Sequence, residues 1–213
     1  MNFWNFLAEN RGEIASLTLE HCAMVGISML LAILVGIPLG ILITRRPALQ
    51  KPVIAAANVV QTIPSLALFG FLLPAPWIGE RAERLAILAL MLYALLPLIR
   101  NTYAGIAGVD LAVLEAARGM GLTERQLLFQ VELPLAASVI LAGVRVAVVI
   151  SIGLATIAAA IGAGGLGELI FRGLTMVDNS VILAGAIPAA LMALAADVGL
   201  GVLEKRFAPQ RAA

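Results

Sequence analysis

The sequence is poor in the residues that ordinarily carry chemistry. Only one cysteine, Cys22, and one histidine, His21, occur among its 213 residues. An intrachain disulfide is therefore impossible, and the sequence offers no metal site of the multi-cysteine or histidine-pair type. No pair of carboxylates, serine–histidine set or Walker A sequence is placed to support catalysis or ATP hydrolysis. We predict no catalytic and no metal-binding residue.

Charge is also scarce. Charged residues make up 13% of the chain, the net charge is +1, and no basic cluster is longer than Arg45-Arg46, which excludes nucleic-acid binding. By contrast, 62% of the residues are hydrophobic and the mean hydropathy is +1.03, which indicates an integral membrane protein surrounded by lipid. We expect no cleaved signal, because residues 1–20 are acidic as well as basic. Their aromatic residues predict a short helix at the outer membrane face.

Five apolar segments are long enough to span a membrane, which needs about 20 helical residues for a hydrocarbon layer of about 30 Å. They are 21–44, 53–73, 85–102, 135–161 and 181–203. The runs are continuous rather than alternating, so we predict helices and an all-α fold. The whole chain, 1–213, is then a single transmembrane domain.

Lysine and arginine counts give the orientation. With the N-terminus outside and the C-terminus in the cytoplasm, nine basic residues fall on the inner side and four on the outer side, which satisfies the positive-inside rule. The inner residues are Arg45, Arg46, Lys51, Arg100, Arg118, Arg125, Lys205, Arg206 and Arg211, and the outer ones are Arg11, Arg81, Arg84 and Arg172. This topology places the polar insert 110–133 in the cytoplasm.

The insert carries the most informative pattern of the sequence. Glu115-Ala116-Ala117 is followed by three residues and Gly121, and Pro134 comes thirteen residues after that glycine. Asp110 is placed to cap a first helix, and Gly121 to end it in a left-handed conformation. Thr123 and Gln126 form a capping-box pattern that opens a second helix, which we expect to continue to Pro134.

The first helix of the insert is too short to be stable alone in water, so it must pack against something. Ala116 and Ala117 would not obstruct an approaching surface, Leu114 and Met120 offer apolar contacts, and Glu115 offers a polar anchor. This combination suits a helix that lies in a groove of a soluble partner. An insert that only caps the bundle is the alternative that these residues leave open.

The insert resembles the EAA loop of permease subunits of binding-protein-dependent ABC importers, with Val131 where that pattern usually has isoleucine. The resemblance extends from about residue 21 to 174 and is closest to permeases for osmoprotectants of the glycine betaine, carnitine and choline type. The stretches that carry it are Gly36 to Ile41, Gln61 to Leu68, Tyr93 to Tyr103 and Ile161 to Gly167.

The resemblance implies a five-helix type I importer core and a cytoplasmic coupling helix in which Glu115, Ala116, Ala117 and Gly121 match the family pattern. It implies a bacterial inner or plasma membrane, a second identical or paralogous permease, and a pair of ATPase subunits that hold the ATP and magnesium, so that this chain needs no cofactor. Because the chain ends ten residues after its last span, we expect a separate substrate-binding protein. A permease for another small polar solute or amino acid is the alternative.

Polar residues within or beside the spans are candidates for the translocation path, which should be weakly polar so that solute is not trapped. They are Gln61, Thr62, Ser65, Tyr93, Asn101, Ser151 and Thr156. Arg145 is the eleventh residue of the fourth span, and a charge at such depth needs a partner or water. Asp197 is the candidate partner, either in a structural ion pair or as part of the path.

The sequence leaves two rival classes of protein. A small secondary transporter would use Arg145, Asp197 and Glu168 in ion coupling, but the inverted repeats typical of that class are not evident. A membrane-embedded enzyme lacks a reactive set of residues. The glycines from Gly162 to Gly167 formally fit a dinucleotide fingerprint, yet they follow a membrane helix rather than a strand. We predict instead a turn at the outer face that lets a partner protein approach closely.

Overall fold

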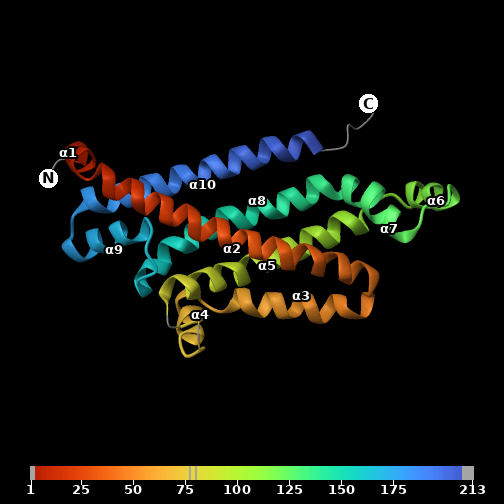
Figure 1. Ribbon diagram of the computed structural model, residues 1–213, viewed down its shortest axis with the longest axis horizontal. Helices are drawn as coiled ribbons and strands as arrows, with labels where there is room; N and C mark the ends of the chain where they lie inside the picture. Colours follow the sequence, from red (N-terminus) through yellow and green to blue (C-terminus); the bar gives the residue numbers. More distant parts are fainter. Residues whose placement is uncertain (1–2, 77, 80, 208–213) are drawn as a thin grey trace.

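Four long helices lying side by side form the body of the protein. The computed structural model describes residues 3–76, 78–79 and 81–207. The long helices are α2 (Arg11–Arg45), α5 (Ala82–Ala107), α8 (Leu133–Ala158) and α10 (Asn179–Phe207). Figure 1 shows α6 and α7 at one end of this bundle, here called the insert end, and α1 and α9 at the other, here called the far end.

The shorter elements connect the long helices or lie across their ends. They are α1 (Phe3–Glu9), α3 (Pro47–Thr62), α4 (Ser65–Leu72), α6 (Leu111–Gly119), α7 (Glu124–Leu127), a π-helical turn (Leu128–Glu132), a 3₁₀ turn (Ala159–Ile161) and α9 (Gly167–Met176). All regular structure in the described ranges is helical, in line with the expected fold class.

Four of the five expected spans lie inside continuous helices that are long and apolar enough to cross a membrane. Segment 21–44 lies in α2, 85–102 in α5, 135–161 in α8 with its 3₁₀ turn, and 181–203 in α10. The first helix begins earlier than expected. Residues 11–20 are part of α2 rather than of a separate segment at the membrane face, and only α1 is a separate short helix.

The second span, 53–73, was expected as one helix, and this expectation is wrong. The chain bends by 102° between α3 and α4. Pro64 is the cause, because it disfavours helical geometry in the preceding residue, and Ile63 is accordingly extended at φ −71° and ψ 126°. The break is held by α5: the Tyr93 hydroxyl donates to the Ile63 carbonyl, and Gln61 Nε2 donates to the Tyr93 carbonyl at 2.8 Å.

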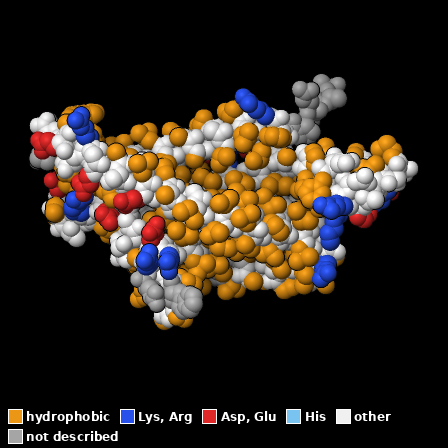
Figure 2. Space-filling model, in the orientation of Figure 1, with side chains coloured by type: hydrophobic (Ala, Val, Ile, Leu, Met, Phe, Trp, Pro, Cys, Tyr) orange, Lys and Arg blue, Asp and Glu red, His pale blue; other side chains and the backbone are white. Residues whose placement is uncertain are grey.

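The core lies where α5 packs between α2 and α8, with α10 on the other side of α8. Small and apolar side chains fill it, among them Ala32, Ala89 and Ala155, which are at most 1% exposed. Figure 2 shows hydrophobic side chains over the middle of the bundle and charged ones gathered at its two ends. A belt of this kind is what a protein embedded in a hydrocarbon layer requires.

Glycines let α8 approach α5 closely. A Cβ atom on Gly143 would lie 2.6 Å from Asn101 Cβ and 2.9 Å from the Pro97 carbonyl oxygen, whereas one on Gly153, in the same helix, would meet nothing within 4 Å. The α5 backbone cannot rotate away as a side chain would. Gly143 is therefore required by helix packing and Gly153 is not.

We predict that Gly143→Ala lowers the free energy of unfolding by about 1–3 kcal/mol, because the added methyl group overpacks the α5–α8 interface. Gly153→Ala is the matched control and should be neutral or stabilising by up to about 1 kcal/mol, since alanine favours helix more than glycine does. Thermal unfolding in detergent measures both. Equal midpoints for the two variants would contradict this account of the interface.

The glycine-rich turn lies at the far end, but it approaches the same chain. Gly162, Gly164 and Gly165 have φ of 79°, 85° and 77°, a region that glycine adopts without strain. The Gly165 amide donates to Glu20 Oε2 at 3.3 Å. A Cβ on Gly165 would lie 3.1 Å from His21 Nδ1. The glycines thus fit the turn against α2 of the same chain, rather than against the partner protein that we predicted.

Candidate functional site

The first helix of the insert, α6, has the ends that the sequence predicts. The Asp110 carboxylate accepts from the Ala112 amide at 2.9 Å. At the other end Gly121 has φ +87°, its amide donates to the Arg118 carbonyl at 2.9 Å, and the Leu122 amide donates to the Ala117 carbonyl at 3.2 Å. These two bonds are a Schellman motif, which satisfies the last carbonyls of α6.

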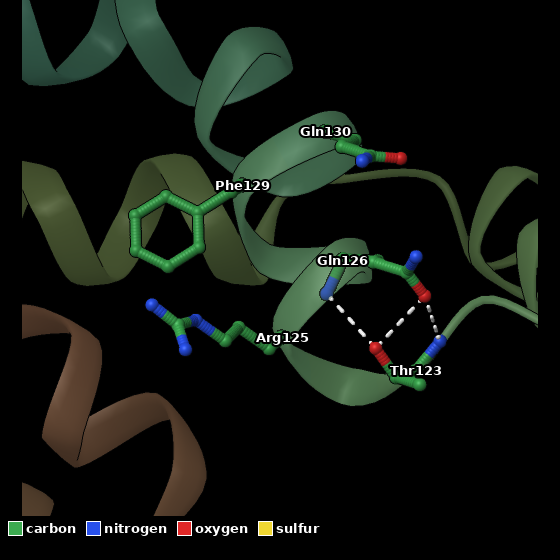
Figure 3. A pocket seen from close by; sticks show the side chains of 5 residues that line it. All are labelled: Thr123, Arg125, Gln126, Phe129 and Gln130. Carbon is green, nitrogen blue, oxygen red and sulfur yellow. Dashed lines mark hydrogen bonds between the residues drawn. The ribbon is translucent and has the colours of Figure 1, made fainter.

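The second helix, α7, opens with the predicted capping box. The Thr123 amide donates to Gln126 Oε1 at 2.9 Å, and the Gln126 amide donates to Thr123 Oγ1 at 3.3 Å. Figure 3 shows this reciprocal pair. The bonds fix the direction in which the chain leaves the turn after α6.

The end of α7 differs from the expectation. The second helix of the insert does not end at Pro134. It passes through the π-helical turn into α8 without a break. Pro134 has no amide hydrogen to give to a helical carbonyl, and the Leu133 amide instead donates five residues back, to Leu128. Such π-turns within helices are frequent at functional sites.

The insert has a small core of its own. Leu127 is 0%, Ala117 3% and Leu114 8% exposed, and they pack with Val109 and Leu122. This corrects the sequence interpretation of Leu114 and Ala117, which we expected to meet a partner. They lie three residues apart, and therefore on one face of α6, and that face is turned to α7.

The opposite face of α6 is open. Leu111 is 71% and Met120 75% exposed, and Glu115 and Ala116 are exposed as well. Two long apolar side chains with an alanine and a carboxylate between them form a face that a groove on another protein can cover. Among the six residues predicted for docking, Glu115, Ala116 and Met120 lie on this face, while Gly121 shapes the turn that ends it.

A second exposed surface lies along α7 and the π-helical turn. A shallow cavity of about 370 Å³ is lined by Thr123, Arg125, Gln126, Phe129 and Gln130. Figure 3 shows the Arg125 and Phe129 side chains on the same side of the helix. Phe129 is 58% exposed, so this side of the insert is also open to contact.

An ion pair at the root of the insert was not foreseen. Both terminal nitrogens of Arg45, the last residue of α2, donate to the two carboxylate oxygens of Glu132, one of them at 3.0 Å. Glu132 is only 2% exposed. The residues are 87 positions apart. The one signal in the sequence was a single acidic residue among mostly apolar residues before Pro134.

Within the bundle, the structure pairs Arg145 with Asp197. Arg145 Nε and Nη2 donate to Oδ1 and Oδ2 of Asp197 at 2.6 and 2.9 Å, and Nη1 donates to Glu204 Oε2 at 3.4 Å. Glu204, seven residues after Asp197 on the same helix, is a further partner that was not predicted. Glu168 lies at the start of α9 and, within the described ranges, forms no ion pair with this group. A role for the group in transport stays a prediction.

Four of the seven path candidates, Gln61, Thr62, Ser65 and Tyr93, meet at the break between α3 and α4, whereas Asn101, Ser151 and Thr156 lie elsewhere on α5 and α8. Ser151 is 0% and Tyr93 8% exposed, so neither can touch a passing solute in this conformation. Most of the other polar groups bond within their own helix: Thr62 to Val59, Asn101 to Pro97 and Thr156 to Gly153. Gln61 instead crosses to α5, and Ser65, half-buried, begins α4. The polar side chains largely satisfy helix contacts.

The fold is that of the membrane permease of an ABC importer. It matches a solved inward-facing MetNI methionine ABC transporter with a TM-score of 0.80, at 22% identity, over 89% of this chain and 93% of that one. A solved amino acid ABC transporter matches with a TM-score of 0.78, at 19% identity, over 97% and 99%. At such identities the likeness concerns the fold alone.

The chain belongs to the family of binding-protein-dependent transport system inner membrane components, whose model matches residues 36–209. A glycine betaine/carnitine/choline transport system permease protein of Bacillus subtilis is 47% identical over 96% of this chain and 88% of its own length. A carnitine transport permease protein of Listeria monocytogenes is 44% identical over 96% and 93%. An osmoprotectant import permease protein of Salmonella typhimurium is 42% identical over 99% of both chains.

This membership defines what the chain does in outline. It is a multi-pass inner-membrane subunit of an ATP-driven importer. It is not itself an enzyme, because ATP is hydrolysed by a separate subunit, and it works with that ATPase and with a substrate-binding protein.

Proposed function

We propose that this permease forms the translocation path for a small osmoprotectant such as glycine betaine, carnitine or choline. The observation that carries the proposal is the 42–47% identity, over at least 96% of the chain, to relatives named for these solutes. The low aromatic content indicates that tight binding of the solute takes place on another protein. With two tryptophans and two tyrosines in the sequence, an aromatic cage for a quaternary ammonium group belongs on the binding protein rather than here.

The exposed face of α6 is the proposed docking site for the ATPase. The small core of the insert packs α6 against α7, and Glu115 and Ala116 lie on the side of α6 that faces away from this core. ATP and magnesium would be held by a pair of such ATPase subunits, and this chain would need no cofactor. Movement of the docked α6 would then drive alternating access as a rigid-body rearrangement of two permeases.

We further propose that the N-terminus lies outside and the insert end in the cytoplasm. The basic residues at helix termini support this topology, because Arg45, Lys51, Arg118 and Arg125 lie near the insert end of the bundle. Arg211, which was counted with them, lies outside the described residues. A second copy of this permease or a paralogue would complete the path, since one five-span subunit provides only one wall.

Reconstitution tests the proposed function. We expect the permease, combined with its ATPase and binding protein in proteoliposomes, to accumulate labelled glycine betaine, carnitine or choline when ATP is enclosed. Unlabelled solute of the same class should compete, whereas methionine should not. Accumulation of methionine without any of the three osmoprotectants would refute the substrate assignment and favour an amino-acid permease.

A further inference from the structure

The ion pair between Arg45 and Glu132 joins two parts of the molecule that are otherwise linked only by packing. Arg45 ends α2 at the insert end, and Glu132 ends the π-helical turn from which the insert projects. Within the described ranges, no other hydrogen bond or ion pair connects α2 to residues 110–132. The pair is therefore the single polar connection between the first long helix and the insert.

Contacts between α6 and α7 hold the insert together as one rigid unit. Leu114 and Ala117 on α6 share a core with Leu127 on α7. Arg118 and Glu124 add a salt bridge of 3.5 Å across the turn between the two helices. Because α7 continues through the π-helical turn into α8, a displacement of α6 is carried directly to the position of Glu132.

The pair is held by burial on the Glu132 side. The carboxylate side chain is 3% exposed, whereas that of Arg45 is 35% exposed. A carboxylate that loses its partner inside an apolar environment is strongly unfavourable, while an arginine at a helix end can turn to water. When the insert moves, Glu132 therefore tends to keep its partner, and the end of α2 moves with it.

Open space beside the pair leaves room for such a movement. A cavity of about 250 Å³ lies between the ends of α2 and α5 and the start of α6, lined in part by Thr44, Tyr103, Ile106 and Leu114. Pro134, two residues after Glu132, has no amide hydrogen for the helical bonding pattern, and a helix bends most readily at such a position. A hinge, a link and a space meet at the root of the insert.

From this arrangement we propose that Arg45 and Glu132 are positioning residues that transmit the displacement of the insert to α2, and through α2 to the core between α2, α5 and α8. The pair links ATP-driven motion to opening of the path, a role that rests on the proposed docking of the ATPase at α6. It acts through α2 and does not touch the solute or the nucleotide.

The test measures solute accumulated per ATP hydrolysed by the complete complex in proteoliposomes, with glycine betaine, carnitine and choline as probes. R45Q and E132Q should lower this ratio at least fivefold while the ATPase still copurifies, and the charge swap R45E/E132R should restore it to within twofold. A merely structural pair would change the yield of folded complex but not the ratio. R172Q and E13Q are matched controls, because Arg172 donates to Glu13 at 2.6 Å in an ion pair at the far end. They should leave the ratio within twofold of the wild type.

Single variants whose ratio equals that of the wild type would overturn the proposal. If the single variants do not assemble, the charge swap decides: a swap variant that assembles and hydrolyses ATP without moving solute would also overturn it. A wild-type complex that hydrolyses ATP but accumulates none of the three probes would refute the substrate assignment instead. The ratio of solute accumulated to ATP hydrolysed would then be measured for the same variants with methionine as the probe.

Discussion

Replacing Ala116 with tryptophan should reduce ATP-driven uptake at least about a hundredfold, which corresponds to about 2.8 kcal/mol of lost docking free energy. Ala116 lies on the exposed face of α6, beside Glu115 and away from the small core of the insert. An indole there would hold the wall of any groove away from the helix backbone. Copurification of the ATPase with the detergent-solubilised permease measures docking, and uptake in proteoliposomes measures the consequence.

Two neighbouring substitutions separate docking from folding. Ala116→Ser adds one oxygen atom and should leave uptake within twofold of the wild type. Ala117→Trp, at a position that is 3% exposed, should instead disrupt the core of the insert and reduce the yield of folded protein. Undiminished uptake by the Ala116→Trp variant would show that this face of α6 does not meet the ATPase, and the proposed coupling site would have to be abandoned.

Leu127→Ala should unfold the insert locally while the membrane bundle stays intact. Leu127 is completely buried, and truncation of such a side chain costs about 2–5 kcal/mol. The insert has few other apolar groups to compensate, and α6 is too short to persist without its support. Amide hydrogen exchange over residues 110–127 should become fast, and ATP-driven uptake should fall by at least about tenfold, the effect of 1.4 kcal/mol.

Leu111→Ala provides the contrast. Leu111 is 71% exposed, so its truncation removes a contact of the proposed docking face without opening a cavity. Hydrogen exchange in the insert should not change, whereas copurification of the ATPase should weaken. Equal protection of the insert in the Leu127→Ala variant and the wild type would show that the small core does not hold α6 in place.

The features that the sequence predicted well are those that depend on neighbouring residues. Asp110, Gly121, Thr123 and Gln126 act within one helical turn of their own positions, and each forms the predicted cap or turn. Apolar runs likewise identify most of the spans, because lipid requires long unbroken helices. Helix caps and membrane spans can therefore both be predicted from a single sequence.

The features that it missed depend on contacts between distant segments. Pro64 made a break possible, but its 102° angle also depends on Tyr93 and Gln61 holding the chain ends to α5. The pair of Arg45 and Glu132 needs the end of α2 to meet the start of α8, which composition cannot reveal. The burial of Leu114 and Ala117 was within reach, since their three-residue spacing with Leu122 beyond the turn defines an inward face.

The far-end turn has a mechanical consequence. There the Gly165 amide donates to Glu20, and His21 Nε2 donates to the Ile152 carbonyl at 3.1 Å, so one polar bond joins α2 to α8 and a second joins α2 to the turn that follows α8. At the insert end one ion pair connects α2 to the start of the same helix. A relative movement of α2 and α8 should therefore be largest at the insert end and smallest at the glycine-rich turn.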